Sequence, residues 1–123
     1  MQFTGRELSA ILKIANAMVL ADGLVAENEI KVMTIELMRF GVPDNLIQGL
    51  MSDANEMDTK DALIILASFD AERKKYVSSY LGTIMASDGV ISEKELSLWR
   101  LVSSLCGFPE MTAAEAINNM ASL

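Results

Sequence analysis

Apolar residues recur at intervals of three and four positions along the whole chain, whereas the strict apolar-polar alternation of a half-buried strand is missing. The pattern predicts an all-α protein, a compact bundle of about seven helices. The expected helices cover 5–21, 27–40, 44–52, 62–69, 71–87, 93–105 and 112–122. A polar stretch at 53–61 is expected to form a surface loop that joins the two halves of the chain.

Signals at the expected helix ends support these bounds. Residues 4–7, 92–95 and 112–115 follow a Thr/Ser-x-x-Glu pattern, the capping box in which a hydroxyl and a carboxylate each accept a backbone N–H at the start of a helix. Gly41, followed by Pro43, predicts the end of the second helix, because glycine adopts the left-handed conformation and proline does not continue a helix.

The chain is similar to itself when it is shifted by 66 residues. The positions that are identical under this shift include the pairs Asp22 and Asp88, Gly23 and Gly89, Glu27 and Glu93, Glu29 and Glu95, Gly41 and Gly107, Pro43 and Pro109. We therefore expect one domain, residues 1–123, with an internal pseudo-two-fold repeat of a helix-turn-helix unit. Its halves are expected at about 5–52 and 70–122.

The negative net charge of the chain limits the classes of partner that it is expected to bind. Asp and Glu number 17 against 10 Lys and Arg, and the resulting net charge of −7 argues against nucleic acid as a partner. The longest apolar run, 62–67, is far shorter than the roughly 20 residues that cross a bilayer, so no membrane span is expected. A single cysteine, Cys106, lies in an apolar stretch, which predicts a reduced, buried thiol and a cytoplasmic protein.

Enzymatic chemistry is not indicated by the residue types. The chain has no histidine, no Ser/His or Cys/His arrangement and no glycine-rich phosphate loop, so we expect that it is not an enzyme. Zinc and di-iron sites are disfavoured for the same reason, since they use histidine or several cysteines. If a metal binds, a divalent cation that prefers oxygen ligands, calcium, magnesium or manganese, is expected.

Both repeated turns follow the pattern Asp-Gly-x-(Val/Ile)-x-Glu-x-Glu, which overlaps the second half of a calcium-binding EF-hand loop. The first half of such a loop is missing. Apolar residues stand where its early oxygen ligands belong: Met18 and Leu20 in one copy, Ile84 and Ala86 in the other. Neither loop can therefore enclose a calcium ion by itself.

Asp22 and Asp88 are the residues of these turns that helix initiation does not explain. Each places a carboxylate at the C-terminal end of an expected helix, where the helix dipole disfavours negative charge by up to about 1 kcal/mol. Two kinds of interaction could offset this unfavourable placement of the carboxylate. Backbone N–H groups of the turn could bond the carboxylate, or a cation could be shared with Glu29 or Glu95.

The Ala-Asp-Gly and Ser-Asp-Gly turns, each followed by an apolar residue and a Glu at the start of a helix, resemble those of the TerB-like family. That family includes the tellurite-resistance protein TerB and the N-terminal domain of DjlA-type co-chaperones. The resemblance covers most of the chain and is best at 14–33 and 80–99. It implies a compact helical domain with two-fold pseudosymmetry, whose acidic turns are linked to divalent metal binding. The ligands it implies here are Asp22, Glu29, Asp88 and Glu95, with Glu27 and Glu93 beside them.

Two functions follow as hypotheses. The first is a non-enzymatic TerB-like module that binds a divalent cation through its acidic turns, in a stress-response or tellurite-resistance context. The alternative is a protein-interaction or scaffold domain, a homodimer included, in which the turns are structural helix junctions and no metal binds. The chain departs from the family pattern at Ala26, which stands in place of a small polar residue.

Overall fold

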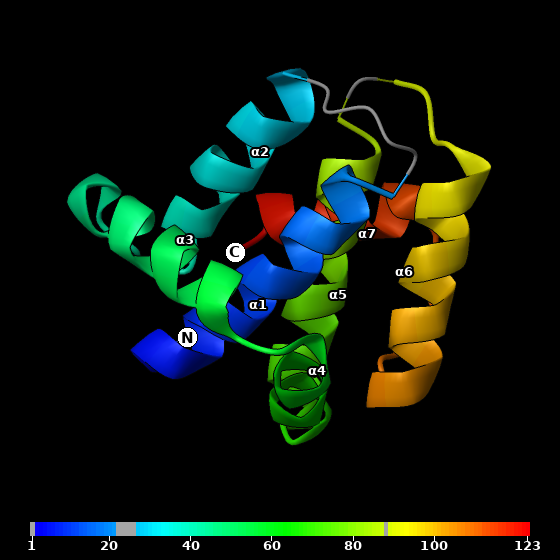
Figure 1. Ribbon diagram of the computed structural model, residues 1–123. Helices are drawn as coiled ribbons and strands as arrows, with labels where there is room; N and C mark the ends of the chain where they lie inside the picture. Colours follow the sequence, from blue (N-terminus) through cyan, green and yellow to red (C-terminus); the bar gives the residue numbers. More distant parts are fainter. Residues whose placement is uncertain (1, 22–26, 88) are drawn as a thin grey trace.

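The computed structural model describes residues 2–21, 27–87 and 89–123, which form a bundle of helices (Figure 1). Within these ranges there are seven α-helices, one short 3₁₀ helix and no strand, so the all-α prediction is confirmed. The elements are α1 (Gly5–Val19), α2 (Glu27–Met38), η1 (Asp44–Leu46), α3 (Ile47–Glu56), α4 (Thr59–Ala67), α5 (Ala71–Met85), α6 (Glu93–Cys106) and α7 (Ala113–Ala121). None of the helices in the described ranges combines the length and the apolar character needed to cross a membrane.

Two helices begin with the capping boxes that the sequence predicts. At α1, Glu7 N–H donates to Thr4 Oγ1 over 3.1 Å, and Thr4 N–H donates to the Glu7 carboxylate over 2.8 Å. At α7, Glu115 N–H donates to Thr112 Oγ1 over 3.2 Å, and Thr112 N–H donates back to the Glu115 carboxylate over 3.1 Å. Both boxes are complete, and each satisfies two backbone donors that a helix leaves without intrahelical partners.

The prediction of a loop at 53–61 is wrong over most of that range. Helix α3 continues to Glu56 and α4 begins at Thr59, so the connection is only two residues long. The prediction rested on the polar composition of this range. A mostly polar segment still forms a helix when one residue per turn packs against the core. Ala54 is that residue, and it is completely buried, while the acidic residues around it face solvent.

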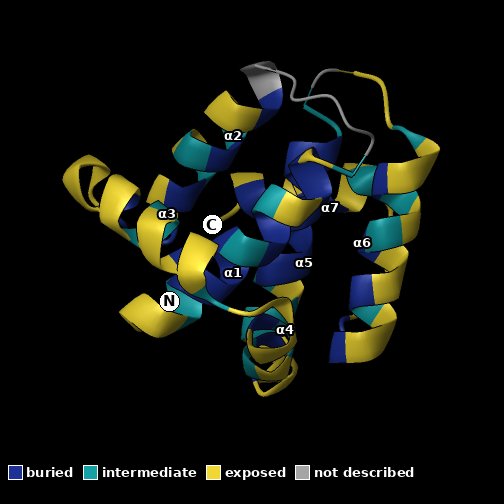
Figure 2. Cartoon of the chain, viewed as in Figure 1, coloured by how far each residue is buried: buried dark blue, intermediate teal, exposed yellow. Residues whose placement is uncertain are grey.

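Helix α5 is the centre of the bundle, and it is buried on every face over its last nine residues, from Val77 to Met85. It contacts α1, α2, α6 and α7, and Figure 2 shows the C-terminal part of α5 in the colour of buried residues. The sequence predicted an apolar stripe on α5. Polar and small residues interrupt that stripe: Ser78 and Ser79 are buried, and at Gly82 the neighbouring helices leave no room for a side chain.

A buried hydrogen bond ties α5 to α2. The hydroxyl of Tyr80, which is fully buried, donates to the backbone carbonyl of Met33 over 2.7 Å. Burial, together with the negative charge of Glu36, raises the pKa of Tyr80 well above its usual value. The tyrosine is therefore a neutral donor at physiological pH, and its ring stacks at a tilt against Phe40, with 5.4 Å between the ring centroids.

The prediction that Cys106 is a buried thiol is confirmed. Cys106 is a free, buried thiol whose sulfur lies 3.6 Å from the carbonyl oxygen of Leu63, and this contact joins α6 to α4. Burial raises the pKa of the thiol, and the charge of Lys74 lowers it by less. A thiol held protonated in this way is a poor nucleophile.

Gly82 is the point where α5 comes closest to its neighbours. A Cβ atom at this position would lie 2.7 Å from the Cβ of Ala116 and 2.8 Å from the indole of Trp99. These two residues belong to α7 and α6. The absence of a side chain at Gly82 therefore sets the distances from α5 to both helices. By contrast, a Cβ atom at Gly49 of α3 would meet nothing within 4 Å.

We predict that Gly82→Ala destabilises the protein by about 1 to 3 kcal/mol, because the new methyl group forces α6 and α7 away from α5. Gly49→Ala is the matched control, and it should stabilise by up to about 1 kcal/mol, because alanine has the higher helix propensity and the site is open. Urea denaturation of both variants measures the two effects. Equal stability of the two variants would show that the helices are not in contact at Gly82.

Candidate functional site

Of the four residues predicted as metal ligands, the structure describes two. Asp22 and Asp88 lie outside the described residues. Glu29 and Glu95 are the third residues of α2 and α6. The C-terminal ends of α1 and α5 and the N-terminal ends of α2 and α6 all lie at the same end of the molecule, the top of Figure 1.

Glu29 and Glu95 are both removed from solvent. Each is only 2% exposed, and they are the two acidic or basic side chains classed as buried in the described part of the chain. Removing a carboxylate from water costs several kcal/mol unless a positive charge or a set of hydrogen bonds replaces the water. A buried carboxylate at both helix starts therefore needs a compensating interaction at this end of the molecule.

Only one of the two carboxylate oxygens of Glu95 has a hydrogen-bond partner among the described residues. The Ser92 hydroxyl donates to Oε1 over 3.0 Å, and the same hydroxyl oxygen accepts the backbone N–H of Glu95 over 3.0 Å. Oε2 is buried as well, and it has no hydrogen-bond partner among the residues that the structure describes. The capping box predicted at 92–95 is thus only half formed, since the carboxylate bonds the serine hydroxyl instead of the serine N–H.

Glu7 and Glu115 show that helix initiation does not require this arrangement. They occupy the same third position of α1 and α7, and both complete their capping boxes at solvent-accessible sites. Glu95 shares the sequence pattern but turns its carboxylate into the protein. The positive end of the helix dipole offsets about 0.3 to 1 kcal/mol of the cost of burying it, which is less than that cost.

The described residues alone do not make a complete metal site. Among them, no group of three or more Asp, Glu, Cys or His side chains is close enough together to hold a metal ion. Glu27 and Glu93 are the two acidic residues that the sequence placed beside the predicted ligands. Glu93 is exposed, and the side chain of Glu27 is not among those that the structure describes. Glu95 is therefore the residue on which the geometry of the candidate site can be judged.

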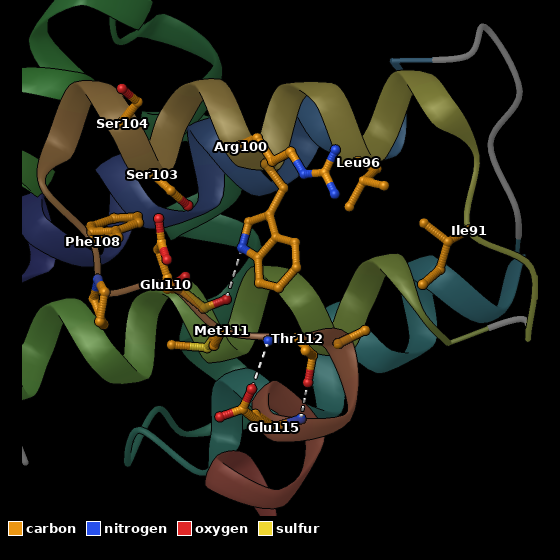
Figure 3. Close-up of a pocket in the computed structure, with 14 residues that line it drawn as sticks. Ile91, Leu96, Arg100, Ser103, Ser104, Phe108, Glu110, Met111, Thr112 and Glu115 are labelled. Atoms are coloured by element: carbon orange, nitrogen blue, oxygen red, sulfur yellow. Dashed lines mark hydrogen bonds between the residues drawn. The ribbon is translucent and has the colours of Figure 1, made fainter.

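A second site was not predicted from the sequence. A groove with a volume of about 940 Å³ lies between α6 and the start of α7, with α5 behind it. Figure 3 shows Glu110 near Phe108 on one side of the groove and Arg100 near Leu96 on the other. The signal for it was present in the sequence, because Ser78 and Ser103 stand where the 66-residue shift places Leu12 and Leu37.

The fold is shared with a solved structure. The crystal structure of a protein of unknown function from Porphyromonas gingivalis W83 is 52% identical in sequence and matches with a TM-score of 0.91, over 98% of this chain and 92% of that chain. This chain belongs to that protein's family. Neither a scan against protein-family models nor a search of curated proteins gives a match. The comparison establishes the fold and the relationship.

We predict that, with divalent cations removed by chelation, Glu95→Gln stabilises the protein by about 1 to 3 kcal/mol, because a neutral amide costs less to bury than a carboxylate. Glu115→Gln is the matched control at the same helix position. Glutamine also completes a capping box, so the control should change stability by less than about 0.5 kcal/mol. Chemical denaturation measures both. A destabilised Glu95→Gln variant would mean that the carboxylate is already compensated without a cation.

Proposed function

We propose that this protein is a non-enzymatic TerB-like module that binds a divalent cation at the end of the bundle where Glu29 and Glu95 lie. The observation that carries the proposal is the buried Oε2 of Glu95, which has no hydrogen-bond partner within the described ranges. A cation beside this oxygen would offset the cost of its burial, and a carboxylate oxygen is the donor that calcium, magnesium and manganese prefer.

One carboxylate does not hold such an ion, so the proposal includes further ligands. Asp88 precedes Glu95 by seven residues and Asp22 precedes Glu29 by seven residues. Both aspartates belong to the short segments that connect the ends of α1 and α5 to the starts of α2 and α6. We propose that Asp22 and Asp88 complete the coordination together with water, which hard divalent cations commonly retain as a ligand.

The proposed internal repeat makes Glu29 and Glu95 equivalent, and several observations support it. The bounds of α5 follow those of α1 by 66 residues at both ends, and α6 begins 66 residues after α2. Gly41 and Gly107 both adopt positive φ angles, of 85° and 70°, after the second helix of each half. Glu29 and Glu95 are equally buried. Two equivalent carboxylates at one end of the molecule are expected for a site built across a pseudo-two-fold axis.

The resemblance to TerB-like proteins gives the proposal its biological setting, a role in stress response of the kind that tellurite resistance represents. The alternative is an interaction domain without metal. Its docking surface would be on α6, where Leu101 and Leu105 are 55% and 59% exposed one turn apart, beside α4, where Ile64 is 58% exposed. The two hypotheses differ in the role of Glu95, and one experiment separates them.

We expect calorimetric titration of the chelator-treated protein with Ca²⁺, Mg²⁺ and Mn²⁺ to show saturable binding of at least one ion. Glu95→Gln should weaken that binding at least about tenfold, since a direct charged ligand is lost. Glu115→Gln, which removes an equal charge at an exposed capping box, should bind as the unmodified protein does. The Asp22→Asn/Asp88→Asn double variant tests the proposed additional ligands in the same way.

Two results would contradict the proposal. The first is the absence of heat with all three ions at millimolar concentration, which would favour the metal-free interaction domain. The second is equal weakening by Glu95→Gln and Glu115→Gln, which would mean that the ion responds to the net charge of the protein and not to a site.

A further inference from the structure

The groove between α6 and α7 is a second candidate site, separate from the carboxylates at the start of α6. Ser103 and Ser104 of α6 form one wall, and residues 108–113 form the other (Figure 3). Its floor contains Trp99, whose indole N–H donates to the backbone carbonyl of Ser78 over 3.1 Å. That bond fixes the orientation of the ring, so the groove has a rigid aromatic base.

The groove exists because small polar residues replace large apolar ones. Under the 66-residue shift, Ser78 corresponds to Leu12 and Ser103 to Leu37, and both leucines are fully buried in the core of the first half. A leucine fills far more volume than a serine, so the second half has space at the position where the first half is filled. The first half therefore shows how the same fold closes this space when no ligand has to enter.

The polar groups of the groove are available for a ligand. Arg100, exposed on α6, forms no ion pair with any residue in the described part of the chain, and Figure 3 shows its guanidinium beside Leu96. A guanidinium binds carboxylates in a two-point geometry, and the indole surface favours an apolar group next to it.

Two acidic residues limit which ligands fit. Glu115 is occupied by the capping box at the start of α7, where its carboxylate accepts Thr112 N–H. Glu110 lines the other end of the groove and has no cationic partner in the described ranges. Figure 3 shows Glu110 near Phe108 and Arg100 near Leu96, so the two charged side chains lie apart along the groove. A ligand with one carboxylate at the Arg100 end fits this distribution of charge, and a second carboxylate near Glu110 would be repelled.

We propose that this groove binds a small monocarboxylate with an apolar body. The carboxylate pairs with Arg100, and the apolar body lies over Trp99 and against Met111. The volume of about 940 Å³ is in the range of small-molecule sites, which combine apolar walls with a few polar groups that fix orientation.

Trp99 is the single tryptophan of the chain, so its fluorescence reports directly on the groove. We expect titration with hexanoate to give a saturable change in emission. Hexylamine, with the same apolar body and the opposite charge, should give none, and the dicarboxylate adipate should bind more weakly than hexanoate because of Glu110. Arg100→Gln should weaken hexanoate binding at least about tenfold, whereas Arg6→Gln, which removes an exposed arginine on α1, should leave it unchanged.

Ser103→Leu provides a second variant that acts by volume and not by charge. It introduces the residue type that the 66-residue shift places at Leu37, and we expect it to fill the groove and abolish the response while the helical content stays the same. No saturable response to hexanoate at tens of millimolar would overturn the proposal. An undiminished response in Arg100→Gln, or an equal response to hexylamine, would overturn it as well.

Discussion

The burial of α5 on all sides is the constraint on which the rest of this structure depends. Four helices contact α5, so each of its faces must match a neighbour in shape, and apolar bulk alone does not satisfy that requirement. Gly82 lets α6 and α7 approach, and Tyr80 uses its hydroxyl to bond the backbone of α2. The positions of α2 and α6 are therefore fixed by α5, and with them the positions of the two buried glutamates at the helix starts.

The two candidate sites use this arrangement in different ways. At the end of the bundle, the start of α6 brings the Glu95 carboxylate into the protein, and a positive charge would offset the cost of burying its Oε2. Along the side of α6, small residues on α5 and α6 leave a groove whose floor is one fixed indole. The first site is defined by a buried oxygen, Glu95 Oε2, that has no partner among the described residues, and the second by a space that no side chain fills. Neither requires the helices to move.

Much of the fold could be predicted from the sequence because the signals are local. Capping boxes at α1 and α7 depend on residues three positions apart, and the structure confirms both. The prediction failed where tertiary contacts decide the outcome. The polar stretch after Ser52 remains helical because Ala54 is buried, and the Ser92 box is half formed because Glu95 turns into the protein.

The candidate sites were predicted less well for the same reason. The sequence places Glu29 and Glu95 close after a turn. A glutamate at the third position of a helix is exposed in one helix of this protein and buried in another, and the local sequence does not distinguish the two cases. Ser78 and Ser103 look like surface residues when each helix is considered alone. Only the comparison of the two halves of the chain, with Leu12 and Leu37 at the matching positions, indicates missing volume.

The central claim is that a divalent cation compensates the buried carboxylate of Glu95. The most direct measurement is the anomalous scattering of Mn²⁺ in crystals grown from the chelator-treated protein and then soaked with the ion. The account predicts an anomalous peak within about 2.5 Å of Glu95 Oε2, the range of metal–oxygen bonds for such ions. Bound Mn²⁺ found only at exposed carboxylates, with Glu95 Oε2 left without a metal, would contradict it.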